Sequence, residues 1–132
     1  MELDHYLNGV NGGNNDFFAQ FNKLDLIKNV VVAYEGDQPV GCGAIKQYTP
    51  DTMEVKRMFV PVDKRGRGIA GMILTELETW AKQLGYKKCI LETALSMEPA
   101  VALYKKSNYT VIPNYDPYIG VDTSICFEKL LS

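Results

Sequence analysis

The fold is decided by the stretch Glu54-Val-Lys-Arg-Met-Phe-Val60, followed by Pro-Val-Asp-Lys-Arg-Gly-Arg-Gly-Ile-Ala70 and an amphipathic run that ends at Leu84. It predicts a strand, a glycine-rich turn and a long helix. Apolar side chains recur every three or four residues along the helix and form one stripe, which consists of Ile69, Ile73, Leu77, Trp80 and Leu84. Gly85 follows at once, as a left-handed cap requires, so we expect the helix to end there.

The turn concentrates positive charge at the start of this helix. Arg65 and Arg67 flank Gly66 and Gly68, where the helix dipole is already positive. Cations there are unfavourable by roughly 0.3–1 kcal/mol each unless a negative group is bound. Glycines let the backbone approach closely, and helix N–H groups and guanidinium groups both bind phosphate oxygens. The turn therefore predicts a phosphate site; the alternative is a solvated basic loop that Asp63 partly neutralises.

The segments around this stretch predict a mixed sheet. Three apolar segments joined by short turns must be antiparallel strands, because parallel neighbours need a long crossover; they are residues 29–34, 39–48 and 53–60. The segment 87–93 is reached through the helix and so lies parallel to 53–60. A second helix and two strands complete the pattern, over residues 99–107, 109–112 and 123–130.

The first residues are expected to add no strand. Residues 1–15 begin with a few apolar residues at helical spacing and continue into an Asn- and Gly-rich loop, and residues 16–26 can form a short helix. His5 is interpreted as surface decoration without a role. The prediction is a single α/β domain over residues 1–132, with antiparallel N-terminal strands, a parallel central pair and flanking helices.

Composition narrows the classes of function. A net charge of −2 and one short basic cluster, Lys64–Arg67, argue against a nucleic-acid surface. No apolar run reaches the length of a membrane span, and the N-terminus lacks a signal peptide's apolar stretch. The three cysteines, Cys42, Cys89 and Cys126, are widely spaced and odd in number. We expect buried thiols in a reducing cytoplasm, and no metal site.

A dinucleotide-binding fold is a weaker interpretation of the same turn. Gly66-Arg-Gly-Ile-Ala-Gly71 matches the pattern G-x-G-x-x-G, with Glu92 about twenty residues further on. However, the preceding strand carries Glu54, Lys56 and Arg57, whereas a strand of that fold is buried on both faces. Three antiparallel strands also come first, and too little chain remains for a second half.

Arg65-Gly-Arg-Gly-Ile-Ala70 fits the signature Arg/Gln-x-x-Gly-x-Gly/Ala of the GCN5-related N-acetyltransferase (GNAT) superfamily. The order of elements over residues 29–129 also resembles this family, in particular a small bacterial subgroup whose members are mostly uncharacterised. The family's usual first strand has no counterpart before Asn29 in our interpretation. The strand at 29–34 would then present an open edge to a second copy, so a homodimer is one expectation.

The resemblance implies acetyl-CoA as the co-substrate. Its pyrophosphate would bind the backbone N–H groups at the start of the helix, from Arg65, Gly66, Arg67, Gly68, Ile69 and Ala70. Its pantetheine arm would pair with the backbone of Met58, Phe59 and Val60, as an added strand does. The Met58 N–H would point at the thioester oxygen and act as a one-donor oxyanion hole.

The resemblance also suggests two catalytic residues. Tyr104 stands where the family has its acid and would protonate the departing thiolate, unless it merely packs in its helix. Glu54 matches the strand glutamate that serves as base in some relatives. A strand period of two places Glu54, Lys56 and Met58 on one face. Three roles therefore stay open for Glu54: it would act as the base directly, act through a water, or simply form an ion pair with Lys56.

The expected activity is that of a small cytoplasmic N-acetyltransferase. It would acetylate a primary amine of a small molecule, or a peptide N-terminus, by direct attack in a ternary complex. The acceptor pocket would be bordered by the loop that contains Tyr115 and Tyr118, unless these tyrosines are only packing. The alternative from another class is a non-catalytic module that binds acyl-CoA.

Overall fold

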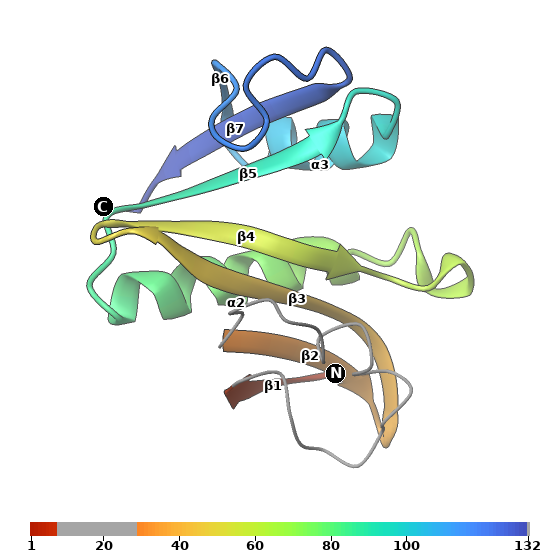
Figure 1. Ribbon diagram of the computed structural model, residues 1–132. Helices are drawn as coiled ribbons and strands as arrows, with labels where there is room; N and C mark the ends of the chain where they lie inside the picture. The colour runs from red at the N-terminus through yellow and green to blue at the C-terminus, as the bar shows by residue number, and fades with distance from the viewer. Residues whose placement is uncertain (8–28, 132) are drawn as a thin grey trace.

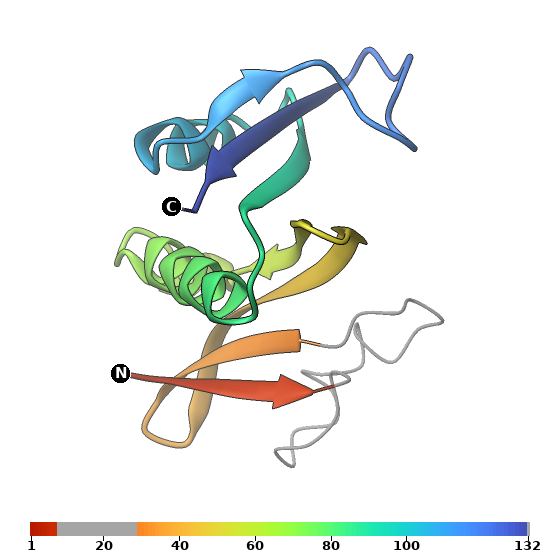
Figure 2. The same ribbon diagram turned by 90° about the vertical axis from the view of Figure 1, so that its left-hand side faces the viewer.

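The computed structural model describes residues 1–7 and 29–131, whose strands form one mixed sheet in the order β1-β2-β3-β4-β5-β7-β6 (Figure 1). The strands are β1 Glu2–Leu7, β2 Asn29–Glu35, β3 Gln38–Thr49, β4 Thr52–Phe59, β5 Lys88–Ala94, β6 Thr110–Ile112 and β7 Ser124–Leu130. The helices are the 3₁₀ turn η2 Val62–Lys64, α2 Ile69–Gln83 and α3 Glu98–Lys106. Figure 2 shows α2 and α3 on the same side of the sheet, which we call the helix face.

The structure corrects the prediction that no strand precedes Asn29. Residues Glu2–Leu7 form β1, which pairs antiparallel with β2 from Glu2↔Tyr34 to Leu7↔Asn29. The first strand of the family is therefore present, and the edge of β2 is covered rather than open to a second copy. The strand escaped detection because only Leu3 is packed against the large core and only Tyr6 against the smaller one, while Glu2, Asp4 and His5 are polar and break the apolar pattern of a strand. The helix expected over residues 16–26 lies outside the described residues.

His5 also has a structural role that the sequence interpretation missed. Its ring stacks on Trp80 of α2 with centroids 4.0 Å apart, and its Nε2 lies 2.8 Å from the Glu76 carboxylate. Both partners are on α2, more than seventy positions further along the chain. The edge strand β1 is thus fixed to the helix by a ring stack and a polar contact.

The predicted hairpins are confirmed, and two glycines of β3 explain how closely α2 packs on them. A Cβ atom on Gly41 would stand 2.9 Å from the side chains of Ile69 and Ile73. One on Gly43 would meet Ile73 and Leu77 at the same distance. The bare backbone at these positions lets the apolar stripe of α2 lie directly on the sheet.

The parallel pair β4 and β5 is confirmed, and it separates after a short contact. The ladder joins Thr52↔Lys88, Met53↔Cys89 and Glu54↔Ile90. Beyond it, β4 continues with β3, whereas β5 pairs with β7 along its whole length. Figure 1 shows the two strands diverging toward the end of β4. The antiparallel neighbours on both sides of this pair exclude the dinucleotide-binding fold.

A bulge in β4 corrects the predicted alternation of its side chains. The register shifts between Ala44↔Lys56 and Cys42↔Phe59, so two residues of β4 oppose one of β3. Arg57 has a φ of 60°, which turns the strand at this point. Met58 therefore packs against the core on the helix face, and not beside Glu54 and Lys56 as a strict period of two predicts.

Candidate functional site

The turn before α2 exposes a helix start whose backbone N–H groups have no side-chain cap. The N-cap residue is Gly68, and none of the side chains that the structure describes bonds to the first turn. Gly66 and Gly68 have φ values of 81° and 79°, with open space where a Cβ atom would stand. The left-handed backbone, rather than crowding, requires glycine at both positions. Such a helix end is suited to bind an anion.

Arginine side chains surround this helix end. Nε of Arg65 donates to the Val60 carbonyl oxygen at 2.9 Å, which holds the side chain against the end of β4. The Arg67 guanidinium lies 3.2 Å from the carboxylate of Glu35, with 49% and 45% of the two side chains exposed. The acid beside the turn is thus Glu35 rather than Asp63. An exposed pair contributes only roughly 0.2–1 kcal/mol, so a diphosphate can replace Glu35.

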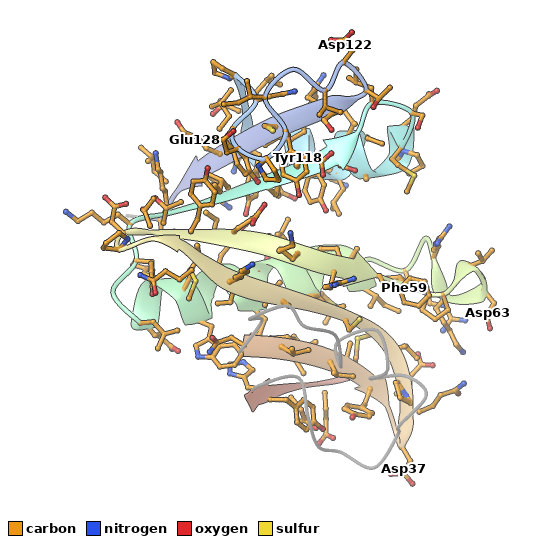
Figure 3. All side chains as sticks on the ribbon, viewed as in Figure 1. Asp37, Phe59, Asp63, Tyr118, Asp122 and Glu128 are labelled. Atoms are coloured by element: carbon orange, nitrogen blue, oxygen red, sulfur yellow. The ribbon has the colours of Figure 1, made fainter. Side chains whose placement is uncertain are left out.

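The remaining predicted cofactor-binding residues lie at the end of β4 and in the first turn of α2. Met58 packs on the helix face, Phe59 is largely exposed and Val60 is buried. Figure 3 shows Phe59 where β4 ends. Ile69 is buried and Ala70 half-buried. This part of β4 lies beyond the ladder to β5, so its backbone on that side faces the space between the diverging strands.

Glu54 lies near the closed end of these strands, on the face of the sheet opposite to the helices. We call this the loop face, because the loop of residues 113–123 covers it. The residue is 7% exposed. Its Oε2 accepts a hydrogen bond from the Tyr115 hydroxyl at 2.8 Å, and its Oε1 is 3.8 Å from the Lys56 ammonium. The predicted proximity of Glu54 and Lys56 is confirmed; the contact with Tyr115 was not foreseen.

Polar contacts shape the loop that carries Tyr115. The Asn114 amide donates to the carbonyl oxygens of Tyr118, Val121 and Ser124 at 3.1–3.4 Å. The Tyr48 hydroxyl donates to the Asp116 carbonyl oxygen at 3.1 Å, which anchors the loop to β3. These bonds hold the loop as one shaped cover over the loop face, on which Figure 3 places Tyr118 in front of the sheet.

The tyrosines of this loop titrate well above their usual range. Burial, and then the nearby Glu54 carboxylate, raise the pKa of Tyr115. Burial, Glu54 and Glu92 raise the pKa of Tyr118 to about 12. Both rings therefore remain protonated phenols at physiological pH; Tyr115 lies beside the Glu54 carboxylate, and Tyr118 lies near both Glu54 and Glu92. The dinucleotide-fold interpretation had singled out Glu92; it instead faces the loop, where its carboxylate accepts from the Ser124 hydroxyl.

Tyr104 lies on α3 and packs into the core on the helix face. Its ring contacts Tyr109 and Phe127 with centroids 5.9 Å away in both cases. Burial raises the pKa of Tyr104 to about 12. Tyr104 and Glu54 therefore lie on opposite faces of the sheet, and the structure does not bring them into contact. The two residues lie on either side of the point where β4 and β5 separate, so each can act in a different step of a reaction that takes place there.

No helix among the described residues is long and apolar enough to cross a membrane. The same residues contain no group of three or more His, Cys, Asp or Glu side chains placed to hold a metal ion. Cys42, Cys89 and Cys126 are buried and form no disulfide, as expected.

Comparison with known proteins identifies the class. A model of the acetyltransferase (GNAT) family matches residues 10–109. The IAA acetyltransferase of Azospirillum brasilense is 32% identical over 98% of this chain and 86% of its own length. YsnE of Bacillus subtilis, an uncharacterised N-acetyltransferase, is 32% identical over 75% of this chain and 67% of its own. The chain belongs to the GNAT family and is an acyl-CoA-dependent N-acyltransferase.

Solved structures show the same fold. An assigned acyl-CoA N-acyltransferase of Klebsiella pneumoniae matches with a TM-score of 0.83 and 23% identity, covering 99% of this chain and 97% of its own. A Bacillus subtilis acetyltransferase in complex with CoA matches with a TM-score of 0.75 and 16% identity, covering 99% and 100%. The mixed sheet with its diverging parallel pair is therefore that of GNAT acyltransferases.

Proposed function

We propose that this enzyme transfers the acetyl group of acetyl-CoA to a primary amine of a small molecule, by direct attack in a ternary complex. A peptide N-terminus is the second choice of acceptor. The observation that carries the proposal is the uncapped, glycine-lined start of α2, which lies just beyond the point where β4 leaves β5. An anion-binding helix end beside an unpaired strand edge can hold both the diphosphate and the amide arm of one coenzyme.

The roles on the coenzyme side follow from this placement. Backbone N–H groups of residues 65–70 bind the pyrophosphate, and Arg67 exchanges Glu35 for it. The backbone of residues 58–60 pairs with the pantetheine arm, and the Met58 N–H stabilises the thioester oxygen as it gains charge, which is typically worth roughly 2.7–4 kcal/mol. Support comes from a similarly folded Bacillus subtilis acetyltransferase that binds CoA and a Bacillus anthracis relative that binds acetyl-CoA.

The roles on the acceptor side fall to the two faces of the sheet. Glu54 accepts the proton of the amine on the loop face, under the loop that carries Tyr115 and Tyr118. Tyr104, on the helix face, donates its phenol proton to the thiolate of CoA. Carboxylates and tyrosine rings suit an ammonium group, which supports an acceptor that arrives as a cation.

The test is release of free thiol from acetyl-CoA in the presence of putrescine, tyramine, L-serine or an alanyl dipeptide. Amine-dependent release, with the acetylated product confirmed by mass spectrometry, supports the proposal. Acetyl-CoA alone should raise the midpoint temperature of thermal unfolding, because a ligand that binds only the native state stabilises it. If the midpoint rises but none of the four acceptors causes release of thiol, the non-catalytic acyl-CoA module is favoured instead.

Replacing Gly68 by alanine is expected to weaken acetyl-CoA binding about tenfold, or roughly 1.4 kcal/mol. The left-handed backbone at Gly68 disfavours a Cβ atom by roughly 1–2 kcal/mol, so the helix start should shift away from its present geometry. Titration of acetyl-CoA followed by calorimetry measures the effect.

Gly85→Ala is the matched control for this prediction. Gly85 has a φ of 93° and open space around it, at the other end of α2. The Gly85→Ala variant should lose about as much stability as Gly68→Ala, yet keep its affinity for acetyl-CoA. Equal affinities of the two variants would show that the turn at Gly68 does not bind the coenzyme.

A further inference from the structure

The carboxylate of Glu54 is not directly accessible to a group bound on the loop face. The residue is 7% exposed, and Oε2 accepts the Tyr115 hydroxyl hydrogen at 2.8 Å. The other oxygen, Oε1, faces the Lys56 ammonium at 3.8 Å. Tyr115 itself is only half-buried. Its phenol oxygen contacts Oε2 directly, from the side on which the loop covers the sheet.

The Tyr115 phenol is held in this position from several sides. Its ring makes edge contacts with Tyr48 at 5.1 Å and with Tyr118 at 5.5 Å between centroids. The preceding residue, Asn114, ties the loop to three carbonyl oxygens. Packing and hydrogen bonds to other groups thus hold the Tyr115 phenol in place without help from Glu54, as a preorganised catalytic group requires.

Charged and titratable groups face Glu54 from every neighbouring element. Lys56 lies on its own strand, and Lys46 of β3 is its cross-strand partner. The loop contributes Tyr115 and Tyr118, and β5 contributes Glu92, which accepts from the Ser124 hydroxyl. Cys126 of β7 also lies nearby, and burial and the nearby carboxylates raise the pKa of its thiol. The tyrosines are too weakly acidic to release a proton alone. A proton can cross Tyr115 only if the phenol gains one while it gives one up.

We propose that Tyr115 is a proton relay between the acceptor amine and Glu54; this rests on the proposed function. The N–H bond of the ammonium breaks as its proton passes to the phenol oxygen. At the same time the O–H proton of Tyr115 passes to Oε2 of Glu54. The nitrogen keeps the electron pair of the broken bond and uses it to attack the thioester carbonyl. Tyr115 is a neutral phenol before and after the step.

A double-mutant cycle with acetyl-CoA and the fastest acceptor among putrescine, tyramine, L-serine and the alanyl dipeptide tests the relay. Glu54→Gln and Tyr115→Phe should each lower kcat by about 10²-fold, the size expected of a proton-transfer group. The double variant should be no slower than the slower single one, because both changes interrupt the same proton path. Independent contributions would multiply to about 10⁴-fold, and that result would overturn the relay.

Tyr48→Phe is the matched control for a merely structural effect. It removes a hydroxyl from the ring packed against Tyr115, together with its bond to the Asp116 carbonyl, and leaves the contact to Glu54 intact. Its effect on kcat should be small and should multiply with that of Glu54→Gln. If the double-mutant cycle of Tyr48→Phe with Glu54→Gln were as non-additive in kcat as that of Tyr115→Phe with Glu54→Gln, Tyr115 would only support the loop.

A wild-type enzyme without amine-dependent thiol release would remove the proposed function and the relay together, whereas an active wild type with multiplicative effects removes the relay alone.

Discussion

Tyr104→Phe is expected to lower kcat by about 10²–10⁴-fold, the range of general acid catalysis, and to change acetyl-CoA affinity less than twofold. The ring contacts to Tyr109 and Phe127 remain in the variant, so the packing of α3 is kept. Only the hydroxyl is lost. Because burial raises the pKa of Tyr104 to about 12, the phenol is protonated at every pH used for assays and is available as the donor. Thiol release gives kcat, and calorimetry gives the affinity.

Tyr109→Phe is the control for this substitution. Tyr109 is the ring neighbour of Tyr104, and its buried hydroxyl lies near Glu78 and Cys89 without a well-formed hydrogen bond among the described residues. Removing this hydroxyl keeps the ring packing and changes no group that we assign to the reaction. The variant should therefore keep wild-type turnover. If both tyrosine variants retain full kcat, Tyr104 is a packing residue and the thiolate takes its proton from elsewhere.

Lys129→Met is expected to destabilise the fold by about 3–5 kcal/mol. The Lys129 ammonium lies 2.9 Å from Oε1 of Glu78, with 25% and 11% of the two side chains exposed. The other oxygen of Glu78 is buried near the Tyr109 hydroxyl, without a well-formed hydrogen bond among residues 1–7 and 29–131. Removing the cation leaves a carboxylate with little access to water. Urea unfolding at neutral pH measures the loss as a lower midpoint with an unchanged slope.

Lys88→Met and a double replacement complete this experiment. Lys88 pairs with Glu128 at 3.2 Å, but its side chain is 37% exposed, so its loss should cost less than about 1 kcal/mol. Glu78→Leu combined with Lys129→Met should recover most of the stability, since apolar packing replaces a buried pair well. A cost for Lys129→Met no larger than that for Lys88→Met would show that Glu78 remains hydrated.

The strand, turn and helix over residues 54–84 were predictable because their signals are local. The apolar stripe of α2 and the glycines at its two ends depend on neighbours within a few positions. The same locality applies to the short turns that make β2, β3 and β4 antiparallel and to the crossover that makes β5 parallel to β4. The family signature lies entirely inside this stretch.

The first strand and the bulge were not predictable, because neither has a pattern of its own. β1 is held by its ladder to β2 and by the stack of His5 on Trp80, which are contacts with residues far along the chain. The bulge places a residue with side chain, Arg57, at a φ of 60°, where sequence preference expects glycine. Its register with β3 decides that Met58 points to the helix face.

By itself, the sequence determined the family and the glycine-rich turn to which we assign the coenzyme, because a helix start, its glycines and its cations occupy consecutive positions. Only the tertiary structure decided the surroundings of Glu54. Its partner Tyr115 is 61 positions away, on a loop that the hydrogen bonds of Asn114 hold in shape. A hydrogen bond between such distant residues leaves no periodicity or spacing in the chain. Folding alone brings that phenol to the carboxylate and so determines how a proton can reach it.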